Sequence, residues 1–227
     1  MKYKNITFGT FVERANRFVG TVEIENVPQT VHIKNTGRCK ELLVPGNRVV
    51  LAVSDNKSRK TKYDLIAVYK NNSLLINMDS QLPNDLVAEW LPKSGIFSQN
   101  AGYSREVTYG NSRFDLCVKD GKNTAFIEVK GVTLEEDGYC RFPDAPTERG
   151  LKHIKELTDC VQKGYGAYII FVAQFYGAKN VSPNYDTHPE FGYALRDAVS
   201  KGVKVIAVDC NVAPQELSIH KEITFTA

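Results

Sequence analysis

The chain has 227 residues, of which 42% are hydrophobic and 24% are charged, and its formal net charge is +3 at pH 7. This composition is ordinary for a globular protein of one large or two small domains. It excludes a membrane-spanning helix, because no apolar run approaches the ~20 residues that cross a bilayer. Met1 to Lys4 lead into no secretory segment, so we expect a cytoplasmic protein with no membrane partner.

Five cysteines are scattered along the chain without a CxxC pair, at Cys39, Cys117, Cys140, Cys160 and Cys210. An odd number at such spacings predicts neither a zinc site nor a disulfide framework. We therefore expect free thiols in a reducing compartment.

Residues 1–80 are predicted to form an N-terminal domain of five short strands. The β-type runs are residues 9–12, 18–25, 30–34, 48–53 and 63–69, separated by turn signals such as Pro45-Gly46-Asn47. Residues 36–43 are predicted to form one or two helical turns, ended by Pro45. Five strands with a helix between the third and fourth indicate an OB-like β-barrel, which commonly binds oligonucleotides, and an SH3-like barrel is the alternative.

Basic residues gather in three clusters of this domain, around residues 14–18, 32–38 and 57–62. In the HIKNTGR segment at residues 32–38, the succession of Asn35, Thr36, Gly37 and Arg38 suits neither a strand nor a core, so we expect a tight backbone turn that holds an anion. Phe18 or Tyr63 would stack on a base or fill the barrel core, and His32 is expected to be an interior histidine. The candidate phosphate-binding residues here are Arg14, Arg17, Lys34, Arg38, Lys40, Arg59 and Lys60.

Residues 81–227 alternate helices and strands. A helix capped near Asn84 is expected to run to residue 91, and strands are expected at residues 104–109, 167–172 and 203–208. Thr147 is predicted to cap a helix that ends near Gly164, and another helix covers residues 189–201. No GxGxxG motif is present, which argues against a Rossmann domain.

A predicted hairpin at residues 113–118 and 124–130, turning at Asp120-Gly121, carries the most distinctive chemistry. Alternation predicts that Phe114, Leu116 and Val118 share an apolar face. Asp115, Glu128 and Lys130 are then expected to share the other face. Two carboxylates and an ammonium in this order resemble the PD-(D/E)xK metal-dependent nucleases. A surface cluster of salt bridges is the alternative.

Phosphodiester hydrolysis by such a site uses a divalent cation. Asp115 and Glu128 are the predicted ligands of Mg²⁺ or Mn²⁺, which prefer carboxylate oxygens, and the Val129 carbonyl is a further candidate. Lys130 is expected to orient water or stabilise phosphate charge, with Glu106 as a third acid. From neighbouring elements, His153 is predicted to assist proton transfer or contact phosphate. Arg113 and Arg149 are predicted to bind phosphate.

Long segments of the chain are similar to the sugar fermentation stimulation protein A family from end to end. They include GTFVERANRF, HIKNTGRCKELLVPG, EVTYGNSRFDL, FIEVKGVTL and RFPDAPTERGLKHIKEL. The resemblance implies an OB-like domain followed by a restriction-endonuclease-like α/β domain, with the nuclease-like acids at Asp115 and Glu128 beside Lys130. It also implies DNA binding without strong sequence preference and regulation of sugar (maltose) metabolism.

We therefore expect a DNA-binding regulatory protein with a nuclease-like metal site. The alternatives are a genuine Mg²⁺- or Mn²⁺-dependent nuclease of DNA or RNA, and an enzyme acting on another phosphate-bearing substrate such as a nucleotide. No helix-turn-helix pattern is visible, which disfavours a sequence-reading repressor. The oligomeric state stays open.

Overall fold

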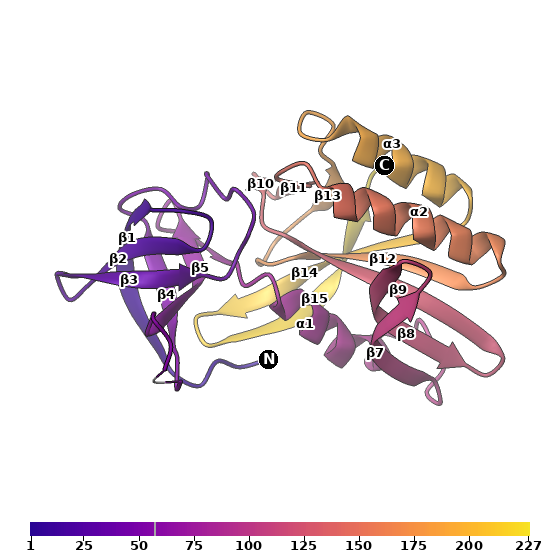
Figure 1. The fold of residues 1–227 in the computed structure, drawn as a ribbon, viewed down its shortest axis with the longest axis horizontal. Coiled ribbons are helices and arrows are strands. Elements are labelled where there is room, and N and C mark those ends of the chain that lie inside the picture. Colours follow the sequence, from indigo (N-terminus) through magenta and orange to yellow (C-terminus); the bar gives the residue numbers. More distant parts are fainter. Residues whose placement is uncertain (57) are drawn as a thin grey trace.

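In the computed structural model, which describes residues 1–56 and 58–227, the N-terminal strands close into a barrel (Figure 1). Lys57, part of the predicted basic run, lies outside the described residues. Neighbouring strands pair antiparallel in the order β3-β2-β1-β4-β5-β6, and a parallel pairing of β3 with β5 closes the ring. The strands are β1 (Ile6–Arg14), β2 (Val19–Ile24), β3 (Val27–Ile33), β4 (Arg48–Val53), β5 (Tyr63–Lys70) and β6 (Leu74–Asn77).

This closure of five strands is that of an OB fold, so the predicted barrel is confirmed and the SH3-like alternative is not adopted. Side chains at alternate positions fill the interior, because successive residues of a strand point to opposite faces. The fully buried members include Phe11, Val22, Val31, Leu51 and Leu65. The short extra strand β6 extends the sheet beyond the barrel.

One turn forms within residues 36–43, where the sequence predicted one or two helical turns. In it, the amides of Leu42 and Leu43 donate to the carbonyl of Cys39. Cys39 itself has a left-handed backbone, with φ at 45°, and Pro45 follows two residues after the turn. Both features stop a helix from propagating, because a helix needs right-handed φ values and a donor at every interior position.

The C-terminal sheet has nine strands in the order β10-β11-β13-β15-β14-β12-β9-β8-β7. All predicted strands and helices of this part are present. The structure adds β10, β11, β13 and β15, which the sequence did not predict. The bounds are α1 (Leu82–Trp90), η1 (Leu91–Lys93), β7 (Gly102–Tyr109), β8 (Ser112–Asp120), β9 (Asn123–Val132), β10 (Glu135–Glu136), β11 (Tyr139–Phe142), α2 (Glu148–Gln162), β12 (Gly166–Ala173), β13 (Asn180–Pro183), α3 (Pro189–Ser200), β14 (Lys204–Ala213) and β15 (Glu216–Phe225).

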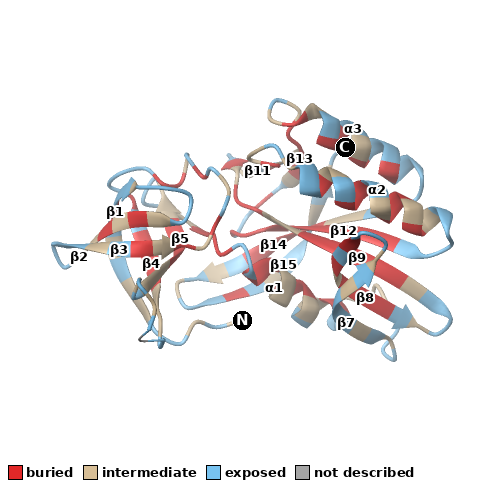
Figure 2. Ribbon diagram, viewed as in Figure 1, coloured by how far each residue is buried: buried red, intermediate tan, exposed pale blue. Residues whose placement is uncertain are grey.

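The centre of this sheet is covered on both faces, with α2 and α3 on one side and α1 on the other (Figure 1). Burial is accordingly concentrated along β9, β12 and β14 (Figure 2). Both connections from β9 to β12 and from β12 to β14 are parallel crossovers through a helix, so their strands are apolar on both faces.

The predicted face of Phe114 is wrong. Leu116 and Val118 pack on the α1 side, whereas the Phe114 ring packs against Phe126 and His153 on the α2 side. The alternation therefore breaks between residues 114 and 116. Asp115 lies at this irregularity, between Phe114 on the α2 side and Leu116 on the α1 side.

Two further expectations concern the whole chain. The five cysteines are all free and buried, as predicted. Within the described residues, the structure contains no helix that is both long and apolar enough to traverse a lipid bilayer.

Candidate functional site

Asp115 is held by two donors where β8, β9 and α1 meet. Its Oδ2 accepts from the amide of Val129 at 2.8 Å, and its Oδ1 accepts from Nδ2 of Asn84 at 2.7 Å. Burial and the nearby charge of Glu128 raise the pKa of Asp115 to about 6. These effects disfavour the ionised form of Asp115, and a bound cation would offset them.

Glu128 is almost fully buried, and its two oxygens have different surroundings. Oε1 is hydrogen-bonded to Nδ1 of His153 and accepts from Nζ of Lys130 at 2.5 Å. Oε2 is buried and has no hydrogen-bond partner. Burial acts against ionisation, but the His153 hydrogen bond and the Lys130 charge outweigh it and lower the pKa of Glu128. A buried, ionised oxygen with no partner is costly unless something else binds it.

The arrangement fits a divalent cation held by Asp115 and Glu128. Mg²⁺ commonly takes one or two protein carboxylates and completes its shell with waters and phosphate oxygens. The described part of the chain has no group of three or more His, Cys, Asp or Glu side chains poised for a metal, so a site here depends on these two. The unpartnered Oε2 of Glu128 is an atom to which such a cation could bind.

One predicted acid of the site, Glu106, is paired elsewhere, and the predicted phosphate ligand Arg149 is open to solvent. Glu106 is exposed and pairs with Arg113, Oε2 to Nε at 2.6 Å, in place of contacting Asp115. Its φ of 55° is left-handed, which removes it from the regular alternation of β7. Arg149 is exposed on the first turn of α2.

Sequence reasoning missed the role of Asn84. It was expected to cap α1, but the helix begins at Leu82 with Gln81 as N-cap, and Asn84 lies inside the first turn. There its amide reaches Asp115. Asn84 follows the apolar Leu82 and Pro83 directly, and no local pattern signals its contact with Asp115. The predicted cap of α2 is correct, since Oγ1 of Thr147 accepts from the amide of Gly150 at 3.0 Å.

In the barrel, Arg14 has a different environment from the one predicted. Its guanidinium makes five hydrogen bonds to backbone carbonyls of two loops, which uses its five N–H donors. The acceptors, at 2.6–3.2 Å, are Asn16, Arg17, Asn35, Gly37 and Arg38. Arg14 therefore clamps residues 16–17 to residues 35–38.

Two other predicted phosphate ligands are engaged by carboxylates. Lys34 pairs with the buried Asp79, Nζ to Oδ2 at 2.7 Å, and Arg59 makes a two-pronged contact with Asp64. His32 is half-buried and also contacts Asp64 at 3.0 Å. The remaining candidates are exposed to solvent: Arg17, Arg38, Lys40 and Lys60.

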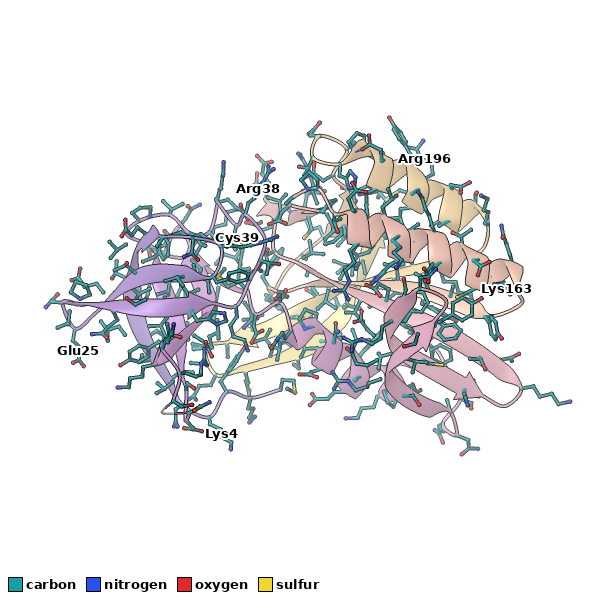
Figure 3. The ribbon with its side chains drawn as sticks, viewed as in Figure 1. Lys4, Glu25, Arg38, Cys39, Lys163 and Arg196 are labelled. Carbon is teal, nitrogen blue, oxygen red and sulfur yellow. The ribbon has the colours of Figure 1, made fainter. Side chains whose placement is uncertain are left out.

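The clamped barrel loop lies against the C-terminal sheet domain, and Figure 3 labels Arg38 and Cys39 at this junction. Oδ2 of Asp144 lies 3.4 Å from the Cys39 amide, and a Cβ on Gly37 would come within 2.3 Å of it. Asp144 belongs to the segment that leads into α2, which carries His153. The barrel and the carboxylate site are therefore physically adjacent through this segment.

A buried polar contact, also missed from the sequence, joins the two sheets. Gln174 donates from Nε2 to Oδ1 of Asn77 at 3.0 Å and to the carbonyl of Asp79 at 3.1 Å. Its Oε1 lies 2.5 Å from the position that a Cβ on Gly131 would take, so Gln174 packs on the residue after Lys130. Gln174 thus links the end of β9, at Gly131, to Asn77 and Asp79 at the end of the barrel sheet.

Comparison with known proteins identifies what this arrangement is similar to. Residues 81–216 match the family model described as "Sugar fermentation stimulation protein RE domain", and residues 12–78 match "SfsA N-terminal OB domain". A sugar fermentation stimulation protein homolog of Ruminiclostridium cellulolyticum is 53% identical over 223 residues, covering 98% of both chains. Another, from Clostridium beijerinckii, is 49% identical over 219 residues, covering 96% of both.

A solved structure also matches. It is titled "The structure of Pyrococcus Furiosus SfsA in complex with Ca2+", and it superposes with a TM-score of 0.87 at 26% sequence identity. The match covers 100% of this chain and 98% of that one. The similarity therefore extends over both the barrel and the nine-stranded sheet.

Proposed function

The chain belongs to the sugar fermentation stimulation protein family, and on this premise we propose that it binds nucleic acid and hydrolyses phosphodiester bonds. A divalent cation held by Asp115 and Glu128, Mg²⁺ or Mn²⁺ in the cell, supports the reaction. DNA is the expected substrate, with RNA as the alternative.

The observation that carries this proposal is the unpartnered, buried Oε2 of Glu128. His153 and Lys130 both bind the other oxygen, so the carboxylate is fixed in one orientation. The His153 and Lys130 contacts keep Glu128 ionised. Its Oε2 makes no hydrogen bond, so a cation can bind this oxygen without displacing either partner.

When bound, the cation would polarise a phosphoryl oxygen and lower the pKa of an attacking water. Asn84 and the Val129 amide keep Asp115 facing the site. Nζ of Lys130, half-buried beside Glu128, can stabilise negative charge that develops on the transferring phosphate. His153 is buried behind Glu128 and acts by orienting it, which differs from the proton-transfer role expected from the sequence.

Two further observations support the proposal. The Pyrococcus furiosus relative is described as a complex with Ca²⁺, a hard cation with the same preference for carboxylate oxygens. The OB barrel presents exposed Arg17, Arg38 and Lys40 on loops next to the segment that leads into α2. Cations on these loops would contact the backbone of a nucleic acid that reaches the site.

The test is incubation of the protein with labelled single- and double-stranded DNA and RNA in Mg²⁺, Mn²⁺ or EDTA. We expect cleavage that requires the cation and is lost in Asp115→Asn and Glu128→Gln. Glu106→Gln, which changes an exposed acid outside the site, should cleave like the wild type.

A second candidate is a DNA-binding regulator of sugar (maltose) metabolism without catalysis, and the family's name supports its link to sugar fermentation. Binding of DNA with no cleavage under any cation would select it over the hydrolase. Its binding should weaken steeply with salt and differ little between DNA sequences, because phosphate contacts dominate.

A further inference from the structure

Phe18 is an exposed aromatic side chain on a loop that is otherwise tightly held. Its exposed fraction is 49%, although it lies between β1 and β2 of the barrel. The side chain of Asn16 fixes the loop, because its Oδ1 accepts from the amides of Phe18 and Val19 at 2.9 and 3.1 Å. The Phe18 carbonyl accepts from the amide of Ile33 at 2.8 Å. The ring is thus presented to solvent from a fixed backbone.

The Arg14 clamp extends this rigidity to the neighbouring loop. The Arg14 guanidinium donates to backbone carbonyls of both loops, and it thereby joins residues 16–17 to residues 35–38. Nε of Arg17 also donates to the carbonyl of Thr36 at 3.0 Å. The two loops therefore form one ordered surface. Because this surface is ordered before a ligand binds, little conformational entropy is lost on binding.

Charge on this surface is positive. Arg17 and Arg38 are both exposed, and Arg14 donates to the backbone carbonyl of each, so both belong to the two fixed loops. Single exposed aromatic residues are common on proteins. Phe18 differs from them because it combines a fixed backbone with adjacent guanidinium groups.

We propose that Phe18 is a stacking platform for an unpaired base, so that the barrel binds single-stranded nucleic acid in preference to a duplex. This inference rests on the proposed nucleic-acid binding and names the form of the substrate. A ring can stack on a base only when that base is not already covered by its neighbours, as in a single strand. The loop between the first two strands is also a site where OB folds bind oligonucleotides. Arg17 and Arg38 then contact the phosphates on either side of the stacked base.

The test compares Phe18→Ala with the wild-type chain by fluorescence anisotropy in EDTA, so that no strand is cut. The probes are a labelled oligothymidine and a labelled hairpin duplex of equal nucleotide number. We expect the wild type to bind oligothymidine more tightly than the duplex. Phe18→Ala should weaken oligothymidine binding by roughly 5- to 150-fold, the range of one aromatic–base stack, and change duplex binding little.

Phe8→Ala is the matched control. Phe8 is 38% exposed on β1 of the same barrel, with the Arg48 guanidinium 4.4 Å from its ring centre, and it should not affect binding. Phe18→Tyr, which keeps the aromatic face, should bind like the wild type. Circular dichroism would verify that each variant is folded.

The remaining outcomes separate the two proposals. If the wild type binds both probes and Phe18→Ala binds them equally well, the stacking platform is refuted while nucleic-acid binding stands. Equal weakening on both probes also refutes the preference for single strands. If the wild type binds neither probe, nucleic-acid binding itself is wrong.

Discussion

Nδ1 of His153 and Oε1 of Glu128 share a hydrogen bond inside the protein, where α2 crosses the end of β9. Both side chains are at least nine-tenths buried. Lys130 donates to the same oxygen, so these two contacts set the orientation of the carboxylate and leave Oε2 without a partner.

Replacing His153 should therefore affect both stability and cation binding. His153→Ala removes a hydrogen bond to a buried charge and leaves a cavity, which should lower the free energy of unfolding by about 2–4 kcal/mol. Urea unfolding in EDTA measures this loss. Cation affinity should fall with it, by about 10- to 100-fold, as for other residues that orient a ligand. A variant as stable as the wild type would show that the hydrogen bond does not hold Glu128.

The raised pKa of Asp115 predicts a stability that depends on pH. Its folded pKa is about 6, against an ordinary value of 3.8, so the folded state binds the proton more tightly. The wild type should lose stability as pH rises from about 4 to about 6 and carry the full penalty above that. Asp115→Asn should be more stable than the wild type at neutral pH in EDTA, by about 1–3 kcal/mol.

Urea titrations at several pH values check this prediction. The difference between Asp115→Asn and the wild type should vanish below about pH 4, where the carboxyl is protonated in both states. A difference that stays constant with pH would mean that the charge of Asp115 is not the cause.

Arg14→Lys should disrupt the clamp, because an ammonium cannot reproduce the planar fork of a guanidinium. Several of the five carbonyl acceptors would lose their donor. We expect a loss of about 2–4 kcal/mol in the free energy of unfolding and weaker oligothymidine binding. Arg17→Lys, which loses a single bond, is the control and should be nearly as stable as the wild type. Equal stabilities for the two variants would contradict the clamp.

Gly131→Ala should strain the junction between the sheets. A Cβ there would lie 2.5 Å from Oε1 of Gln174 and 2.8 Å from Cγ of Pro83. Overpacking of this kind costs about 1–3 kcal/mol. Thermal unfolding of Gly131→Ala, Gln174→Ala and the double variant would show whether removing the Gln174 side chain relieves part of the strain. Strictly additive losses would mean that the Gln174 side chain is not the source of the strain in Gly131→Ala.

Much of the fold follows from local sequence patterns. The strands and helices that the sequence predicted are apolar or amphipathic, and the Thr147 cap is a local hydrogen bond. The strands that were missed depend on tertiary pairing. β15 is mostly exposed and polar, and it becomes a strand because β14 and β13 pair with it on either side.

The candidate site was only partly predictable for the same reason. Asp115, Glu128 and Lys130 follow from their spacing on one hairpin. Asn84 and Gln174 come from other elements, so no local pattern places them. Glu106 fits the alternation of β7, but its left-handed backbone turns it toward Arg113, and a conformation of this kind is rarely predictable for a residue other than glycine.

The central claim is that Asp115 and Glu128 together hold a divalent cation. Isothermal titration of the metal-free protein with Mn²⁺ tests it most directly, in the wild type, Asp115→Asn, Glu128→Gln and Glu106→Gln. We predict binding to the wild type and to Glu106→Gln, and a loss of affinity of at least about tenfold in the other two. Wild-type affinity in Glu128→Gln would contradict the claim, since the unpartnered oxygen of Glu128 would then have no part in cation binding.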